Sequence, residues 1–168
     1  MYQRTRVFLA AAVALVAVLV TARAADESTA RFGRLKALAG DWTMAGGDGS
    51  VAVTYTVTGN GSAVVETIFP GSDHEMVTMY TMNKGDIVLT HYCSMGNQPR
   101  MRSAKGGTAS SIAFKFDGGD NVVMAKDIHM HDLDFTFVDA DHVKAAWHLY
   151  SGGKESEVKS FDLVRKKS

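Results

Sequence analysis

The sequence predicts an all-β protein, a single antiparallel up-and-down β-barrel of about ten strands with a short N-terminal helix. Three observations support this fold class. Apolar and polar residues alternate with a period of two in many short runs. Gly, Asn and Asp residues separate these runs at regular intervals, and the 168 residues include only two prolines. A closed barrel suits such strands because closure removes the edges that a flat sheet would expose.

The first 24 residues predict a secretory signal peptide. Arg4 and Arg6 precede an apolar run of fourteen residues, 7–20, and small residues follow at Ala22 and Ala24. A membrane anchor is the alternative, but a spanning helix needs about 20 apolar residues. We therefore expect cleavage, no stable membrane insertion afterwards, a periplasmic or secreted location, and one domain over residues 25–168.

The charge and cysteine content of residues 25–168 exclude some classes of protein. Removing Arg4, Arg6 and Arg23 from the 18 basic residues leaves 15 against 18 acidic residues, a net charge of −3. This argues against nucleic-acid binding, which needs a basic surface. A single cysteine, Cys93, cannot form an intramolecular disulfide. We expect a monomer stabilised by its core alone, with Cys93 either a buried apolar residue or a protected thiol.

A short helix is predicted before the first strand. Ser28 is suited to the N-cap, Phe32, Leu35 and Leu38 share one helical face, and Gly40 can end the helix in the left-handed conformation. Everything after Gly40 has the pattern of strands, the first of them at 41–45.

The next strands form a predicted hairpin. Residues 50–58 alternate with a period of two, and Asn60-Gly61 is a strong hairpin signal before a strand at 63–69. A two-residue turn would place Tyr55 opposite Glu66, on the side of the sheet that also carries the valines. Glu66 would then point into the barrel.

A second hairpin is predicted over residues 75–82 and 86–93, across Lys84-Gly85. In this register Tyr80 faces Leu89, and Thr78 faces His91. His91 would then share the inner, apolar face. The opposite face of this hairpin is also rather apolar, so the inverse orientation stays open.

Five further strands are expected, at 99–104, 111–116, 132–138, 142–150 and 156–165. Between them, residues 118–126 are interpreted as a longer loop over one mouth of the barrel. The inward positions of the later strands are mostly large and apolar: Ile112, Phe114, Phe116, Leu133, Phe135, Phe137, Val143, Ala145, Trp147 and Leu149. Because a ten-stranded barrel is usually too wide for side chains to fill, we expect some hollow inside it.

An inward Glu and an inward His are costly unless they pair, hydrogen-bond or meet a ligand. One interpretation is that Glu66 and its neighbours only satisfy buried polarity. The other is a polar spot in an apolar cavity, the usual form of a small-molecule site. The candidate ligand-binding residues are Tyr55, Glu66, Tyr80, His91, Cys93, Arg100, His129, His131 and Trp147.

Two segments resemble the calycin superfamily, which includes lipocalins, fatty-acid-binding proteins and nitrobindins. Gly40-Asp41-Trp42 matches the Gly-x-Trp that opens the first strand there, and Arg165 stands where an Arg of the last strand packs on that Trp. The segment 91–101 and His129-Met130-His131 are similar to uncharacterised exported bacterial lipocalin-like proteins. The resemblance implies a calycin-like barrel, with Trp42 and Arg165 as structural residues at its base.

The leading hypothesis is therefore an exported barrel that binds a small, largely apolar molecule. The first alternative is a metal- or haem-binding barrel that uses His91, His129 or His131, with copper or zinc as the metal, since His129 and His131 have a metal-compatible spacing and Cys93 supplies sulfur. No metal set or cofactor is assigned. Nitrobindin-like haem binding would need a histidine near the chain end, and none follows His148.

A structural or partner-binding envelope protein is the remaining alternative. The sequence favours binding over catalysis because no nucleophile motif, phosphate loop or Cys-x-x-Cys is present. Acid and base roles for Glu66 and His91 stay open, and no catalytic residue is assigned.

Overall fold

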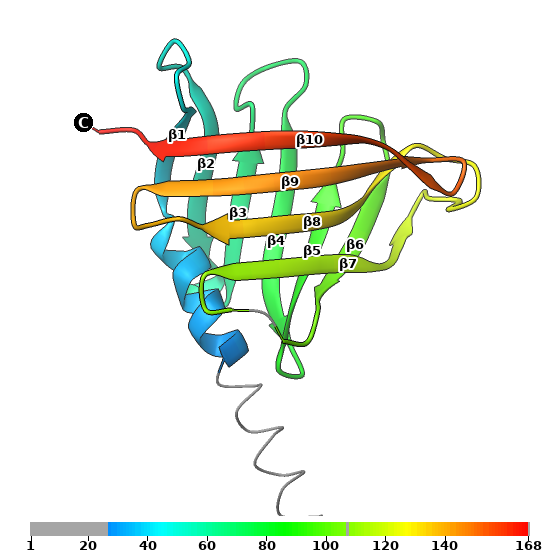
Figure 1. Cartoon of the computed structure of the whole chain (residues 1–168), viewed down its shortest axis with the longest axis horizontal. Helices are drawn as coiled ribbons and strands as arrows, with labels where there is room; N and C mark the ends of the chain where they lie inside the picture. Colours follow the sequence, from blue (N-terminus) through cyan, green and yellow to red (C-terminus); the bar gives the residue numbers. More distant parts are fainter. Residues whose placement is uncertain (1–26, 107, 168) are drawn as a thin grey trace, which may run out of the picture.

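The computed structural model describes residues 27–106 and 108–167, so the predicted signal peptide lies outside the described residues. It confirms the predicted fold class: ten strands form one closed antiparallel barrel, with a helix at residues 27–37 (Figure 1). The strands are β1 (Gly40–Met44), β2 (Val51–Thr58), β3 (Ala63–Ile68), β4 (Met76–Asn83), β5 (Asp86–Tyr92), β6 (Gln98–Ser103), β7 (Ser111–Asp120), β8 (His129–Phe137), β9 (His142–Ser151) and β10 (Lys154–Arg165); a single 3-10 turn spans Gly59–Gly61.

Each strand pairs with its neighbours in sequence, and β1 pairs with β10 to close the ring. This topology is consistent with a calycin-like fold. The helix lies at the end of the barrel where β1 begins and β10 ends, and its Phe32, Leu35 and Leu38 are buried in the core. None of the helices in the described part of the chain has the length and hydropathy to cross a membrane.

Both predicted hairpin registers are confirmed. Tyr55 is paired with Glu66 across β2 and β3, and Thr78 is paired with His91 across β4 and β5. The inner face of the second hairpin is the one that carries Tyr80 and His91, because both side chains are buried while Met79, on the other face, is exposed. Lys84 and Gly85 both have positive φ, as a tight two-residue hairpin turn requires.

The region from 117 to 131 differs from the prediction. Strand β7 continues to Asp120 and β8 begins at His129, so the loop between them covers only residues 121–128. Gly118-Gly119 was interpreted as part of a loop, but both glycines lie inside β7. A Cβ at Gly119 would lie 2.8 Å from Gln98 O and Pro99 Cα. The glycine therefore permits close approach of β6 at an irregularity in the ladder, and does not mark a turn.

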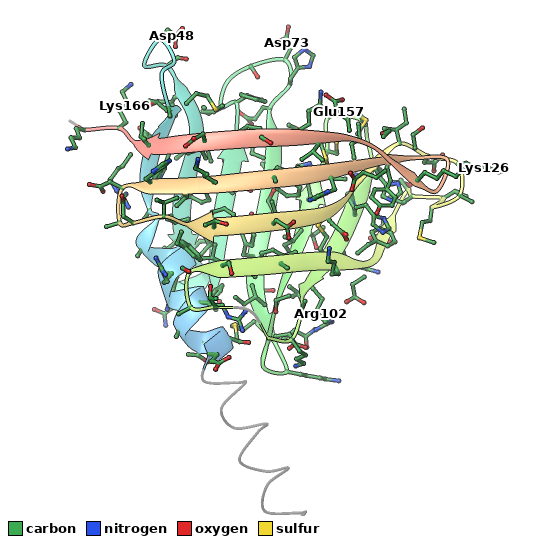
Figure 2. All side chains as sticks on the ribbon, in the orientation of Figure 1. Asp48, Asp73, Arg102, Lys126, Glu157 and Lys166 are labelled. Atoms are coloured by element: carbon green, nitrogen blue, oxygen red, sulfur yellow. The ribbon has the colours of Figure 1, made fainter. Side chains whose placement is uncertain are left out.

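The outer surface carries the charged side chains, and the labelled Asp48, Asp73 and Lys166 lie at loops and at the chain end (Figure 2). The core inside the barrel contains large apolar side chains from all around the sheet. Those with almost no exposure include Trp42, Tyr55, Tyr80, Phe114, Phe135, Leu89, Met101, Ile112 and Leu133.

Trp42 and Arg165 close the end of the barrel that carries the helix. They are partners across the β1–β10 seam, and the Arg165 Cζ lies 4.5 Å from the centroid of the fully buried Trp42 ring. Arg165 also donates to the carbonyls of Ala37 and Ala39, at 2.9 Å each, while Trp42 Nε1 donates to Leu38 O at 2.8 Å. Both side chains thus satisfy carbonyls at the helix C-terminus, which would otherwise lack partners.

This closure predicts coupled stability effects. Trp42→Ala should destabilise the protein by about 3–5 kcal/mol, as deletions of large buried aromatics do, and Arg165→Ala by about 1–3 kcal/mol through lost charge-assisted hydrogen bonds. The double variant should fall short of the sum because the two residues share one contact. Urea unfolding of the wild type, the two single variants and the double variant measures these changes in the free energy of unfolding.

Arg102→Ala is the control, since its ion pairs lie on the surface and should contribute less than about 1 kcal/mol. Strict additivity of Trp42→Ala and Arg165→Ala would contradict the coupling.

Candidate functional site

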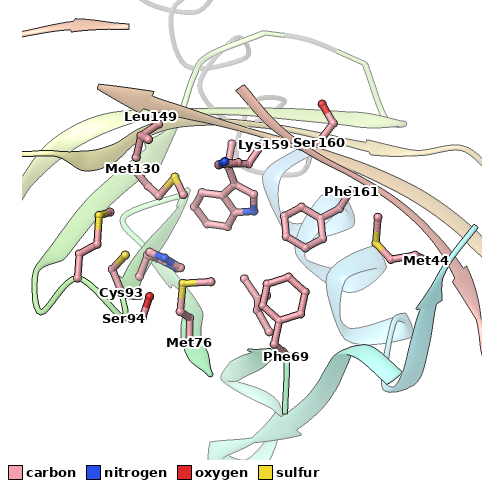
Figure 3. A pocket seen from close by; sticks show the side chains of 14 residues that line it. Met44, Phe69, Met76, Cys93, Ser94, Met130, Leu149, Lys159, Ser160 and Phe161 are labelled. Atoms are coloured by element: carbon pink, nitrogen blue, oxygen red, sulfur yellow. The ribbon is translucent and has the colours of Figure 1, made fainter. Parts of the chain in front are cut away.

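A cavity of about 500 Å³ opens at the end of the barrel opposite the helix. Its walls come from the ends of β1, β3 and β5, the beginnings of β4 and β8, and the facing parts of β9 and β10 (Figure 3). The lining is mostly apolar and rich in sulfur: Met44, Ile68, Phe69, Met76, His91, Cys93, Ser94, Met95, Met130, Trp147, Leu149, Lys159, Ser160 and Phe161. In an up-and-down barrel every second loop lies at the same end. The residues that line the cavity therefore come from segments that are far apart in the sequence.

The two sides of the cavity differ in chemistry. Met76, Cys93 and Met130 gather on one side, and Phe69 and Phe161 lie on the other (Figure 3). The two phenyl rings contact each other, with centroids 5.7 Å apart. Flexible, polarizable thioethers facing an aromatic wall can adapt to ligands of different shapes.

A row of polar side chains crosses the inner face of four consecutive strands beside the cavity. Tyr55 on β2 is the partner of Glu66 on β3, Glu66 is the partner of Thr78 on β4, and Thr78 is the partner of His91 on β5. All four are at most 2 % exposed. Because each of these residues is the partner of the next across neighbouring strands, the four form a continuous polar line inside an otherwise apolar barrel.

Two phenol groups converge on the Glu66 carboxyl. Tyr55 Oη donates to Oε1 at 2.6 Å, and Tyr80 Oη donates to Oε2 at 2.9 Å. Burial raises the pKa of Glu66 above its ordinary value, and the nearby hydroxyl groups of Tyr55, Tyr80 and Thr78 act in the opposite direction. Burial, followed by the charge of Glu66, raises the pKa of Tyr55 well above its usual value, so this phenol remains a donor at neutral pH.

His91 ends this row at the cavity wall. Its Nδ1 lies 2.9 Å from Thr78 Oγ1, and its ring packs on Trp147 with centroids 4.7 Å apart. The Thr78 hydroxyl can donate to Nδ1 or accept from Nδ1–H, so this contact fits either tautomer of the neutral imidazole. The other nitrogen, Nε2, is buried and has no hydrogen-bond partner in the described part of the chain.

Burial also decides the charge of His91. The side chain is 1 % exposed, and desolvation lowers its pKa from 6.5 to about 4. His91 is therefore neutral at physiological pH, and its ring forms part of the cavity lining.

Two other titratable groups line the cavity. Lys159 is the ladder partner of Trp147, so it faces the same side of the sheet, but its side chain is 50 % exposed and its ammonium bonds Glu157 at 2.6 Å. Burial raises the pKa of the Cys93 thiol, which is thus protonated at neutral pH.

His129 and His131 form a separate cluster with Phe116 and Tyr150. His131 stacks on Tyr150 at 4.0 Å and on Phe116 at 4.6 Å between ring centroids. His129 Nδ1 lies 3.0 Å from Asp127 O, and its Nε2 lies 3.0 Å from His131 Nδ1. A carbonyl can only accept, so His129 carries its proton on Nδ1 and accepts from His131 through Nε2. Both nitrogens of His129 are therefore occupied within the protein.

The structure divides the nine predicted ligand-binding residues into four groups. His91, Cys93 and Trp147 line the cavity. Tyr55, Glu66 and Tyr80 lie in the buried hydrogen-bond network next to it. His129 and His131 form their own cluster, and Arg100 is exposed on the outer face of β6, 3.8 Å from Asp120.

Most of the apolar wall was missed by the sequence analysis. Met44, Phe69 and Met130 lie at or near strand ends, where the alternating pattern stops distinguishing inside from outside, whereas Phe161 lies inside β10. The position of Met76 could have been predicted, because the predicted register of the second hairpin places Met76 opposite Cys93, on the same face of the sheet. A sequence pattern alone does not show which strand ends surround an open cavity.

Comparison with known proteins adds no assignment: no family model matches the chain, and a search of curated proteins also finds no match.

The burial of His91 predicts a dependence of stability on pH. Its pKa is lower in the folded state than the ordinary 6.5, so the unfolded chain binds more protons between these values and stability falls as the pH falls from about 6.5 to about 4. We expect the wild type to lose about 3 kcal/mol more than His91→Asn between pH 7 and pH 4. The raised pKa of Glu66 acts in the opposite direction and is present in both proteins.

Urea unfolding of the two proteins across this range measures the difference. Asn is the matched variant because its side-chain amide can hydrogen-bond Thr78 in place of Nδ1 without titrating. Parallel pH profiles for the wild type and His91→Asn would show that His91 is not buried in its neutral form.

Proposed function

We propose that the protein is an exported barrel that binds a small, largely apolar molecule in the cavity at the open end. The observation that carries this proposal is the cavity itself, of about 500 Å³, with a mostly apolar lining that includes the neutral imidazole of His91. Small-molecule sites typically have volumes of about 300–1,000 Å³, apolar walls and a few polar groups. Export is supported by the sequence pattern of residues 1–24 alone.

The opposite end of the barrel supports a binding role for this cavity. Trp42, Arg165 and the helix fill and cap that end, and a closed base leaves one route in and out of the interior. The base of the barrel is packed, whereas the open end of the cavity is lined by flexible Met side chains that can adapt to the shape of a ligand.

The hydrogen-bond row gives Glu66 and His91 a supporting role in binding. Thr78 stands between them in the ladder, and its hydroxyl contacts His91 Nδ1 at 2.9 Å. This contact holds the imidazole in one orientation, as partners of a histidine commonly do. Because Thr78 separates Glu66 from His91, the geometry favours a positioning role for both over an acid and base that exchange protons with a ligand.

Uptake of a neutral apolar dye tests the proposal. N-phenyl-1-naphthylamine should bind the purified protein and gain fluorescence as it leaves water. Leu149→Trp adds bulk to the cavity wall and should weaken binding at least tenfold, since the added indole occupies ligand space. Met79→Trp is the matched control because Met79 lies on the outer face of β4 and is 38 % exposed. Equal binding by both variants, or no binding by the wild type, would contradict a ligand in this cavity.

A soft metal ion is the second candidate for the same cavity. Its support is that the neutral imidazole of His91 and the side chains of Met76, Cys93 and Met130 line one space. Copper(I) accepts imidazole and sulfur ligands. Among the described residues no group of three or more His, Cys, Asp and Glu side chains could hold a metal, so a metal here would depend on the methionines.

The structure does not fit a haem held in the nitrobindin manner. His148 is the last histidine of the chain, and its nitrogens bond Glu155 and Asp134, at 2.8 and 3.2 Å. The last strand, β10, contains no histidine.

Elemental analysis of protein purified without chelators separates the two candidates. A soft-metal site predicts about one copper per chain, lost in His91→Asn and retained in His131→Asn, because His131 belongs to the other cluster. Metal-free protein that still binds the dye would exclude this second candidate.

A further inference from the structure

We propose that one side of the cavity mouth is a docking surface for an anionic lipid bilayer. This surface, called the mouth rim below, consists of the loops at 93–97 and 121–128 and the turn at 152–153 between β9 and β10. Val123 and Met124 would lie at the boundary between lipid headgroups and acyl chains, with Lys126 and Lys154 against lipid phosphates. The barrel would then lie on the membrane surface without spanning it.

The mouth rim exposes several large apolar side chains. Single exposed apolar residues are normal on a protein surface, but a group of them marks a site of interaction. Asn97 Nδ2 donates to Ile128 O at 2.8 Å and thereby joins the two loops, so their exposed side chains belong to one surface. Four of these side chains are between 47 % and 54 % exposed: Met95, Val123, Met124 and Ile128.

Two lysines lie beside this apolar group. Lys126 N donates to Val123 O at 2.8 Å, so a tight turn holds the two residues together. Lys154 follows the turn at 152–153, where a Cβ at Gly153 would lie 3.8 Å from Ala125 Cα of the neighbouring loop. Both lysines are exposed, neither forms an ion pair with a described residue, and Lys126 lies at the end of the barrel (Figure 2). Apolar side chains flanked by unpaired cations fit an anionic lipid surface.

The acidic side chains near the mouth rim do not pair with these lysines. Each has another partner: Asp127 bonds the amide of Val123 at 2.6 Å, Glu155 bonds His148 at 2.8 Å, and Glu157 bonds Lys159 at 2.6 Å. The ammonium groups of Lys126 and Lys154 therefore remain available for lipid phosphates.

The other side of the mouth is acidic. The loops at 45–50 and 69–75 follow each other around the barrel and contain Asp48, Asp73 and Glu75 but no Lys or Arg. Asp48 and Asp73 lie well apart from Lys126 (Figure 2). An anionic bilayer attracts the lysines and repels the acidic loops, so the charge distribution determines which side of the mouth docks. A second copy on the same surface would instead bring the lysines of two chains together.

The mouth rim is continuous with the cavity. Met95 is exposed on the rim and also lines the cavity, and the loop at 121–128 leads within two residues to Met130 in the cavity wall. Docking would therefore place the apolar opening against the bilayer and give an apolar ligand a path that avoids water. That consequence rests on the proposed function, whereas the docking itself does not.

Sedimentation with vesicles tests the docking. We expect the wild type to bind vesicles of equal parts phosphatidylcholine and phosphatidylglycerol in about 0.1 M NaCl. Binding should be about tenfold weaker or less with phosphatidylcholine alone, and weaker in about 0.5 M NaCl, because salt screens the lysines. Two double variants should each weaken binding to the anionic vesicles at least about tenfold: Val123→Ser/Met124→Ser, through lost apolar contact, and Lys126→Glu/Lys154→Glu, through charge repulsion.

The matched controls carry the same changes at exposed positions away from the mouth rim. Met79→Ser/Val138→Ser removes two exposed apolar side chains, and Lys166→Glu/Lys167→Glu reverses two exposed charges at the chain end. Both should bind the anionic vesicles as the wild type does. Residues 1–24, where retained, are common to all of these proteins, so the comparison of matched variants reports on the mouth rim alone.

A tryptophan in the mouth rim reports insertion directly. Met124→Trp fluorescence should shift to the blue with anionic vesicles and be quenched by brominated phosphatidylcholine, whereas Val138→Trp fluorescence should not change. The native Trp42 and Trp147 are buried and give the same background in both proteins.

Four results would overturn the proposal. They are no binding of the wild type to the anionic vesicles, equal binding to neutral and anionic vesicles, equal binding by the rim variants and their controls, and a dimer of the wild type that Val123→Ser/Met124→Ser dissociates, since the surface would then join two copies. Uptake of N-phenyl-1-naphthylamine without vesicles tests the proposed function separately, so the failure of one is distinguishable from the failure of the other.

Discussion

The barrel closes where the first and last strands meet, and Arg165 connects that seam to the N-terminal helix. Its guanidinium lies over the Trp42 ring and donates to carbonyls at the helix C-terminus. Gly40 begins β1 next to this contact with a φ of 122°, a backbone conformation that residues with a side chain rarely adopt. Because these contacts fill one end of the barrel, the space that ten strands leave inside is available at the other end.

The closed base and the cavity are physically connected. Trp42 meets Tyr55 edge to face, with centroids 6.2 Å apart, and Tyr55 begins a row of ladder partners that runs through Glu66 and Thr78 to His91. Each polar member of the row lies in a desolvated interior, where an unpaired group would be costly. Hydrogen bonds join Tyr55 to Glu66 and Thr78 to His91, and within this row Nε2 of His91 is the buried atom that has no partner among the described residues.

Much of the fold could be predicted from residues close together in the sequence. The turns around Asn60-Gly61 and Lys84-Gly85 set the registers of their hairpins, and strand alternation then showed which side chains share a face. The prediction was wrong at Gly118-Gly119, where glycine allows close approach of a neighbouring strand. Local sequence cannot distinguish these two uses of glycine, because the distinction depends on a strand that is remote in the chain.

The sequence by itself determined the fold class and the inward position of Glu66, because hairpin register and a period of two are local properties. The Trp42 and Arg165 pair was expected from the resemblance to calycins, since residues so far apart in the chain share no local pattern. Only the tertiary structure decided which face of the second hairpin points inward, and that Glu66 lies beside Thr78. It also decided that His129 and His131 bond each other away from the cavity, and that Met76, Met130 and Phe161 surround it. These relations depend on the closure of the ring and on which strand ends meet at its open mouth, and long-range packing sets both.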